Sequence, residues 1–182
     1  MIHLRDDELI RGIQSGDTSA LDKIIETYYK EVFQFLCRKL SNFEAAQDVT
    51  QTVFTKFAAT FSRYDERGKL RNYLFKLAAN AGNDWFRKKT DFVPLDELQE
   101  FESNESTPEE STINRDTAAT VKRSLQMLPD FQRDVIILRF YHDLPFKDIA
   151  RITGHNLSST KSRYRQGMEK LKNLLKKEIY YE

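Results

Sequence analysis

The chain has 182 residues, of which 40% are hydrophobic and 31% are charged, and its formal net charge is +1. No stretch approaches the 18 or so consecutive apolar residues of a membrane helix, and the first residues lack the apolar core of a signal peptide, so we expect a soluble cytoplasmic protein. Its single cysteine, Cys37, excludes an internal disulfide, and none of the three histidines has a cysteine partner at metal-ligand spacing. We therefore expect no metal site and no cofactor.

The charge is distributed unevenly along the chain. Residues 1–90 hold 15 basic and 12 acidic side chains, residues 91–114 hold 0 and 8, and residues 115–182 hold 14 and 8, which gives net charges of +3, −8 and +6. The middle stretch combines low apolar content with charge of one sign, which is typical of a solvated, flexible linker. A surface loop within one domain is the alternative, but its length disfavours it. The sequence predicts domains over 1–90 and 115–182, joined by an acidic linker over 91–114.

The N-terminal block predicts four helices. The first begins at Asp6 or Asp7, continues to Ser15 and stops at Gly16. Its acids Asp6, Asp7 and Glu8 are interpreted as first-turn residues that complement the helix dipole. Asp17 is placed to cap the second helix. Apolar residues then recur at three- and four-residue steps over residues 21–40, 45–61 and 70–85. Four helices with a shared apolar face predict a small bundle, so we expect an all-α protein.

The C-terminal block predicts a helix-turn-helix. A short helix begins near Pro145 and a longer one near Leu157, and Ala150, Gly154 and Thr160 have the spacing of this motif. Two helices that cross closely need a small residue at the contact, the turn favours glycine, and the second helix must point an apolar group back. Thr160 supplies only a methyl group where valine or isoleucine is expected.

The second helix of this motif carries polar and basic side chains suited to DNA. Residues 151–177 contain 8 basic residues and one acid, Glu169, as DNA binding requires. A helical hairpin with an ordinary basic surface is the alternative. The donors expected to face base edges and phosphates in a major groove are Ser158, Ser159, Lys161, Ser162, Arg163, Arg165 and Gln166.

A second basic cluster, over residues 61–89, has aromatic residues among its cations. Aromatic rings stack on unpaired bases while cations follow the backbone, a combination that suits single-stranded nucleic acid. Tyr73 and Trp85 continue an apolar helical stripe and are interpreted mainly as packing residues. The candidate strand-binding residues are Arg63, Lys69, Arg71, Asn80, Asn83 and Arg87.

Taken together, residues 6–36, 45–57, 61–89 and 128–171 resemble, in order and spacing, the extracytoplasmic-function (ECF) group of bacterial RNA polymerase sigma factors. The resemblance implies a region-two-like N-terminal bundle and a region-four-like helix-turn-helix. It also implies that Asp48, Gln51 and Phe54 dock core RNA polymerase, although Thr52 stands where the family usually has glutamate.

The resemblance further implies that the loop over residues 61–69, together with Asn80, captures a flipped base of the minus-ten element. Lys161, Ser162, Arg165 and Gln166 match positions that face the minus-thirty-five element, and Arg163 is assigned to a phosphate.

The function implied is promoter-specific initiation. The expected partners are core RNA polymerase and promoter DNA, both duplex and melted, with an anti-sigma protein as a further candidate because the family commonly has one. No small-molecule substrate is expected, and no catalytic constellation is evident, so we expect no enzymatic activity. The alternative is a helix-turn-helix regulator with an N-terminal sensor or dimerisation domain, which would leave the basic, aromatic segment unexplained.

Overall fold

The protein folds as an assembly of helices. The computed structural model describes residues 2–61, 64, 69–92 and 112–181. Within these ranges all regular secondary structure is helical, and turns connect the helices. In chain order the helices are α1 (Ile2–Gln14), α2 (Thr18–Leu40), α3 (Phe43–Thr60), α4 (Leu70–Phe92), α5 (Thr112–Gln126), α6 (Asp130–Phe140), α7 (Phe146–Thr153) and α8 (Leu157–Tyr181). The all-α prediction is confirmed. In this part of the chain no helix is long and apolar enough to cross a membrane.

The predicted turn between the first two helices is confirmed. Gly16 has a φ of +94°, which favours glycine, and the side chain of Asp17 accepts a hydrogen bond from the backbone N–H of Ser19 at 2.9 Å. Asn42 caps α3 in the same manner, accepting from the backbone N–H of Ala45 at 2.7 Å. These caps fix where α2 and α3 begin.

The prediction for the start of the first helix was wrong. The helix begins at Ile2, so Asp6 and Asp7 lie beyond its first turn. Asp6 is buried, and both of its carboxylate oxygens lie within 2.9 Å of the Tyr28 hydroxyl, which donates to them. A buried carboxylate needs such a donor, and this one ties α1 to α2.

The acidic stretch predicted as a linker lies largely outside the described residues, which resume only at Thr112. Helix α4 extends to Phe92 and α5 begins at Thr112, so both helices enter the predicted range 91–114. Residues 93–111, which connect α4 to α5, are outside the described residues.

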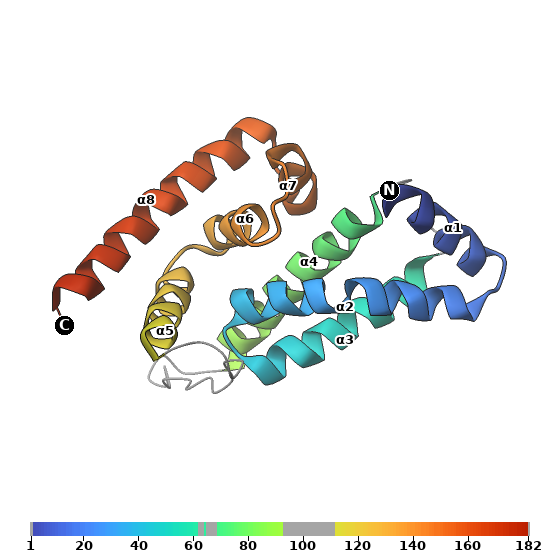
Figure 1. The fold of residues 1–182 in the computed structure, drawn as a ribbon, viewed down its shortest axis with the longest axis horizontal. Helices are drawn as coiled ribbons and strands as arrows, with labels where there is room; N and C mark the ends of the chain where they lie inside the picture. The colour runs from blue at the N-terminus through green and yellow to red at the C-terminus, as the bar shows by residue number, and fades with distance from the viewer. Residues whose placement is uncertain (1, 62–63, 65–68, 93–111, 182) are drawn as a thin grey trace.

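The N-terminal half (α1–α4) and the C-terminal half (α5–α8) pack against each other. Figure 1 places α5–α8 on one side of the molecule and α1 at the opposite end, with α2, α3 and α4 between them. One apolar core continues through both halves, and it joins Phe35 and Phe75 to Ile137, Leu138 and Ile149. A smaller cluster between α5, α6 and α8 is formed by Leu125, Leu128, Ile136 and Leu171.

Candidate nucleic-acid interface

Helices α7 and α8 form the predicted helix-turn-helix. Gly154 ends α7 with a φ of +70°, and its backbone N–H donates to the carbonyl of Ala150. Asn156 then caps α8 by accepting from the backbone N–H of Ser159 at 2.7 Å. Thr160 is fully buried, and its hydroxyl donates to the Asn156 carbonyl at 2.9 Å. This bond satisfies the hydroxyl, so threonine serves at a position where an aliphatic residue is expected.

The first turns of α8 present the predicted donors outward. Ser158, Lys161, Arg163, Arg165 and Gln166 are exposed, and Ser159 and Ser162 are half-buried. Among the described residues, these exposed cations form no ion pair, and the guanidinium of Arg163 lies 5.4 Å from the ring centroid of Phe131 on α6. The side chains on this face of α8 are thus free to meet a groove.

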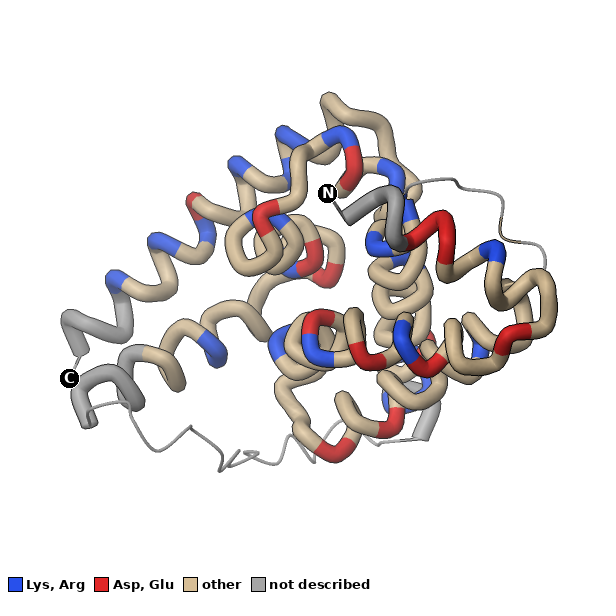
Figure 2. The backbone as a smooth tube through the Cα atoms, turned by 45° about the vertical axis from the view of Figure 1, so that its right-hand side comes forward, with Lys and Arg blue, Asp and Glu red and all other residues tan. Residues whose placement is uncertain are grey.

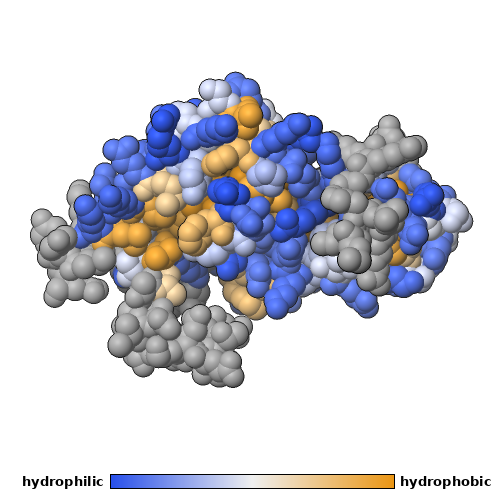
Figure 3. All heavy atoms as spheres, turned by 45° about the horizontal axis from the view of Figure 1, so that its top comes forward, coloured by the Kyte–Doolittle hydropathy of each residue, from blue (hydrophilic) through white to orange (hydrophobic). Residues whose placement is uncertain are grey.

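Basic residues recur along residues 157–176 of α8, where Glu169 is the single acidic residue, and Figure 2 shows this run of positive charge. The outer edge of the C-terminal half is correspondingly hydrophilic, and the apolar surface lies inward of it (Figure 3). Helix α8 therefore has one apolar side, which includes Tyr164, Met168 and Leu171, and one cationic side. This division suits a helix that packs on its own domain and faces a polyanion.

On α4 the two predicted amides lie together. Asn80 and Asn83 are both exposed, and both line a hollow between α4 and the C-terminal half. Across this hollow lie Asp130 and Phe131 of α6 and His155 of the turn before α8. The structure thus brings the α4 amides beside residues of the other half, a neighbourhood that the sequence did not predict.

Two of the predicted cations near α4 pair with acidic residues. Arg71 binds both oxygens of Glu31 at 2.9 and 3.1 Å and also donates to the carbonyl of His142 at 3.1 Å. Arg87 pairs with Asp84 one turn earlier at 3.0 Å. Lys69 is half-buried before the start of α4, and Arg63 lies outside the described residues.

Helix α3 exposes part of the surface predicted to dock polymerase. Asp48 and Gln51 are exposed, whereas Phe54 is 5% exposed and stacks against Tyr29 with ring centroids 5.9 Å apart. Phe54 therefore packs within the N-terminal bundle beneath the two polar residues. Thr52, at the position where glutamate is usual, donates to the carbonyl of Asp48.

A polar network between the halves escaped sequence reasoning. Lys39 of α2 donates to both oxygens of Asp134 of α6, at 2.6 and 2.7 Å, and both side chains are buried. Arg133 is also buried and donates to the carbonyls of Leu125, Gln126 and Leu128, which closes the turn from α5 to α6. Residues 132–134 are all polar or charged, yet the tertiary packing buries all three.

The turn after α6 buries a histidine at the same junction. His142 packs against the rings of Phe35 and Phe75, and its Nε2 has no hydrogen-bond partner among the described residues. Burial lowers the pKa of His142 from 6.5 to about 4, with Arg38 and Arg71 lowering it further and Glu31 opposing them. His142 is therefore neutral in this arrangement at physiological pH. Among the described residues no group of three metal-ligating side chains is assembled.

Comparison with known proteins agrees with this architecture. The family model described as Sigma-70 region 2 matches residues 24–92, and that described as Sigma-70, region 4 matches residues 124–173. The chain is 25% identical over 177 residues to the ECF RNA polymerase sigma factor SigW of Bacillus subtilis, covering 92% of this chain and 95% of SigW. It is 23% identical to the RNA polymerase sigma-H factor of Pseudomonas aeruginosa, covering 94% of each chain.

Two solved structures share the fold. The sigma factor RpoE, in complex with the anti-sigma factor NepR from Bartonella quintana, superposes with a TM-score of 0.68 at 22% identity, covering 85% of this chain and 96% of RpoE. CnrH, in complex with the cytosolic domain of CnrY, gives a TM-score of 0.72 at 20% identity, covering 94% and 97%.

The two family models match in the order region 2 then region 4, and the relatives align over nearly their whole length. The helix-turn-helix and the bundle before it are the parts that these models describe. The chain therefore belongs to the extracytoplasmic-function group of bacterial RNA polymerase sigma factors, proteins that bind core polymerase and direct promoter-specific initiation.

Proposed function

We propose that the chain recognises two promoter elements through two separate surfaces, one on α8 and one on α4. The observation that carries the proposal is the first part of α8, where exposed serine, lysine, arginine and glutamine donors follow a capped helix-turn-helix. Lys161, Ser162, Arg165 and Gln166 read the upstream element in the major groove. Arg163, together with Ser158 and Ser159, contacts the phosphate backbone.

The α4 surface binds the melted strand. Asn80 and Asn83 are exposed on one face of α4 and supply amides that can pair with a base edge. Extruding a base costs a few kcal/mol of unstacking, which contacts to the bound base must offset. Arg71 and Arg87 supply positive charge on the same helix, Lys69 directly precedes it, and Arg63 is a further candidate cation.

Helix α3 docks core polymerase through Asp48 and Gln51, with Phe54 holding the helix in place. The chain acts in the cytoplasm, where polymerase and promoter lie, and performs no chemistry of its own. An anti-sigma protein is a further partner, since both structural relatives were solved in complex with another protein, one of them a named anti-sigma factor.

Reconstituted transcription tests this proposal. Purified chain is added to core polymerase from its own organism, and promoters that support initiation are selected from a random duplex library. We expect initiation at a promoter with two separated conserved elements. Selection of a single element, or no initiation at all, would contradict the proposal.

A further inference from the structure

A buried ion pair holds the two halves of the molecule together. The side chain of Lys39 has no exposed surface, and its ammonium lies 2.6 and 2.7 Å from the carboxylate oxygens of Asp134. The stem of Lys39 runs beside Gly82 of α4, where a Cβ would lie 2.5 Å from Cε. Lysines are almost never fully buried without a partner, so the burial of Lys39 depends on a residue of the other half.

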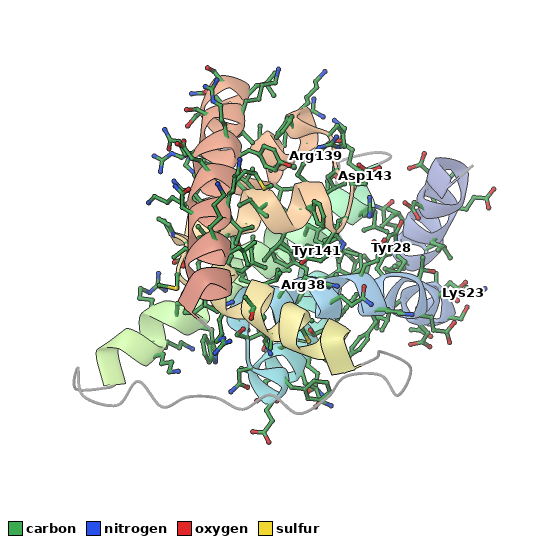
Figure 4. All side chains as sticks on the ribbon, turned by 60° about the vertical axis from the view of Figure 1, so that its left-hand side comes forward. Lys23, Tyr28, Arg38, Arg139, Tyr141 and Asp143 are labelled. Carbon is green, nitrogen blue, oxygen red and sulfur yellow. The ribbon has the colours of Figure 1, made fainter. Side chains whose placement is uncertain are left out.

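Weaker contacts surround this pair, and together they form what we call the seam. Gln126 of α5 donates to the carbonyl of Arg38 at 2.9 Å. The guanidinium of Arg38 in turn lies 4.2 Å from the ring centroid of Tyr141 at the end of α6, and Figure 4 shows these two side chains approaching each other. Arg71 of α4 reaches the carbonyl of His142 at 3.1 Å. The seam therefore spans α2 and α4 on one side and α5, α6 and the turn after α6 on the other.

The apolar core that crosses between the halves favours closure, whereas the central ion pair adds little net free energy to it. Both charges lose their hydration when the halves close, and an ion pair in a protein interior regains little more than that cost. When the halves separate, water can solvate Lys39 and Asp134 again. An apolar pair of similar volume would suffer no such desolvation and would hold the halves more tightly. Removing one partner alone would leave an unpaired buried charge, which strongly favours separation.

The seam also crowds the α4 surface proposed to bind the melted strand. The hollow lined by Asn80 and Asn83 is closed on its other side by Asp130, Phe131 and His155. The Asp130 side chain is about half exposed there. A nucleic-acid strand that follows α4 would have to displace these side chains, and its phosphates would be repelled by the carboxylate of Asp130.

We propose that the seam is a reversible closure, set by the Lys39–Asp134 pair, which competes with binding of the melted strand along α4. The closed form holds the strand-binding amides beside the C-terminal half, and separation of the halves frees them. This inference rests on the function proposed above for Asn80 and Asn83. The apparent strand affinity then scales with the fraction of molecules that are open.

Three variants test the closure: two are expected to open the seam and one is expected to tighten it. Asp134→Ala leaves Lys39 unpaired and opens the seam. Lys39→Met combined with Asp134→Leu replaces the pair with apolar side chains and tightens it. Gln126→Ala removes one bond at the edge of the seam and opens it slightly, which keeps the test available if Asp134→Ala fails to fold. Asp148→Ala is the matched control, because Asp148 pairs with Arg151 inside α7.

Closure is measured as a distance in the full-length chain. Donor and acceptor dyes are placed on cysteines introduced at the exposed positions Glu44 of α3 and Lys172 of α8, in a Cys37→Ala background. We expect a longer mean distance for Asp134→Ala and Gln126→Ala, and a distance no longer than that of the parent for the apolar double variant. Equal distances in the parent, Asp134→Ala and the double variant would overturn the inference.

Competition is measured with a fluorescein-labelled single-stranded 15-mer that carries the melted strand of a promoter selected as above. Relative to wild type, we expect Asp134→Ala to bind it about tenfold more tightly and the double variant about tenfold more weakly. Asp148→Ala should match wild type. If the seam opens but the strand binds no more tightly, the proposal that closure competes with strand binding is overturned.

Transcription initiation by the wild-type chain distinguishes failure of the closure inference from failure of the proposed function. If wild type initiates at a selected promoter while the variants differ neither in distance nor in strand affinity, only the closure inference is overturned. If wild type does not initiate with core polymerase, the proposed function fails and the competition fails with it, whatever the dye distances show.

Discussion

The two surfaces proposed to meet DNA differ in what surrounds them. The α8 surface points away from the rest of the molecule, and its exposed donors form no hydrogen bond or ion pair with the described residues of the N-terminal half. The α4 surface faces a hollow whose other wall belongs to the C-terminal half. Contact with duplex DNA through α8 is therefore compatible with the closed arrangement, whereas contact with a strand along α4 requires the arrangement to change.

The largest expected difference concerns base readout by α8. Lys161→Ala should lose about 1–3 kcal/mol of promoter binding if Lys161 makes a bidentate base contact, with altered preference at one upstream base pair. Lys172→Ala, also on an exposed side of α8 but farther along it, is the control. The loss should be the same in the Asp134→Ala background, because the α8 surface does not depend on the seam. Equal weakening across all upstream sequences would instead assign Lys161 to a phosphate.

The next effect is a pH dependence of the seam alone. His142 has a pKa of about 4 when buried and an ordinary value near 6.5 when the halves separate, so the open form binds a proton that the closed form does not. Closure is thus fully favoured above pH 6.5 and weakens as pH falls toward 4, by up to about tenfold per pH unit. Dye distances at pH 7.5 and 5.5 measure this shift.

The variant His142→Phe separates the contribution of the histidine to this pH dependence from that of the other titratable groups of the seam. Glu31, Arg38 and Arg71 face His142 and stay in place in His142→Phe. The drop in closure between pH 7.5 and 5.5 should disappear in this variant, because the phenylalanine ring packs against Phe35 and Phe75 without taking up a proton. An unchanged drop would show that another group causes it.

A smaller effect is expected for the α4 amide. Asn80→Ala should impair initiation on duplex promoters more than on pre-melted templates, by about tenfold, because the lost contact offsets unstacking only when the strand must be opened. Asn173→Ala, an exposed asparagine on α8, is the matched control. Equal loss on both templates would show that Asn80 does not act in melting.

The smallest expected effect compares two helix caps. Asp17→Ala and Asn156→Ala should each cost about 1 kcal/mol of stability, measured by denaturant unfolding, since each removes a side-chain acceptor at a helix start. Only Asn156→Ala should also weaken DNA binding, because α8 begins there and its first turns carry the donors. Weaker DNA binding by Asp17→Ala would show that the α8 surface depends on the far end of the molecule.

Much of this fold could be predicted because its signals are local. The caps at Asp17 and the turn at Gly154 depend on residues within a few positions, and the apolar stripes follow the helical period. The α8 donors could be predicted for the same reason, since they lie on one face of one helix. The start of α1 was misplaced because Asp6, which resembles a first-turn acid, is buried against Tyr28, 22 residues away.

The seam could not be predicted because its residues are far apart and look like surface residues. Lys39 and Asp134 are 95 positions apart. Each of their two helices would still have one apolar side and one polar side if its charged residue faced water. Arg71, which stays a candidate for strand binding, pairs in this structure with Glu31 and with a carbonyl of the other half. The charge pattern of the sequence does not show which tertiary partners such a cation has.

Gly82 links substitutions in both halves. A side chain at this position would collide with the stem of Lys39, and a displaced Lys39 would leave Asp134 buried without its ammonium. Substitutions at positions 39, 82 and 134, which lie on three different helices, are therefore expected to depend on one another. Among relatives with this packing, we expect a residue larger than glycine at the equivalent of position 82 to occur together with loss of the lysine and of the aspartate.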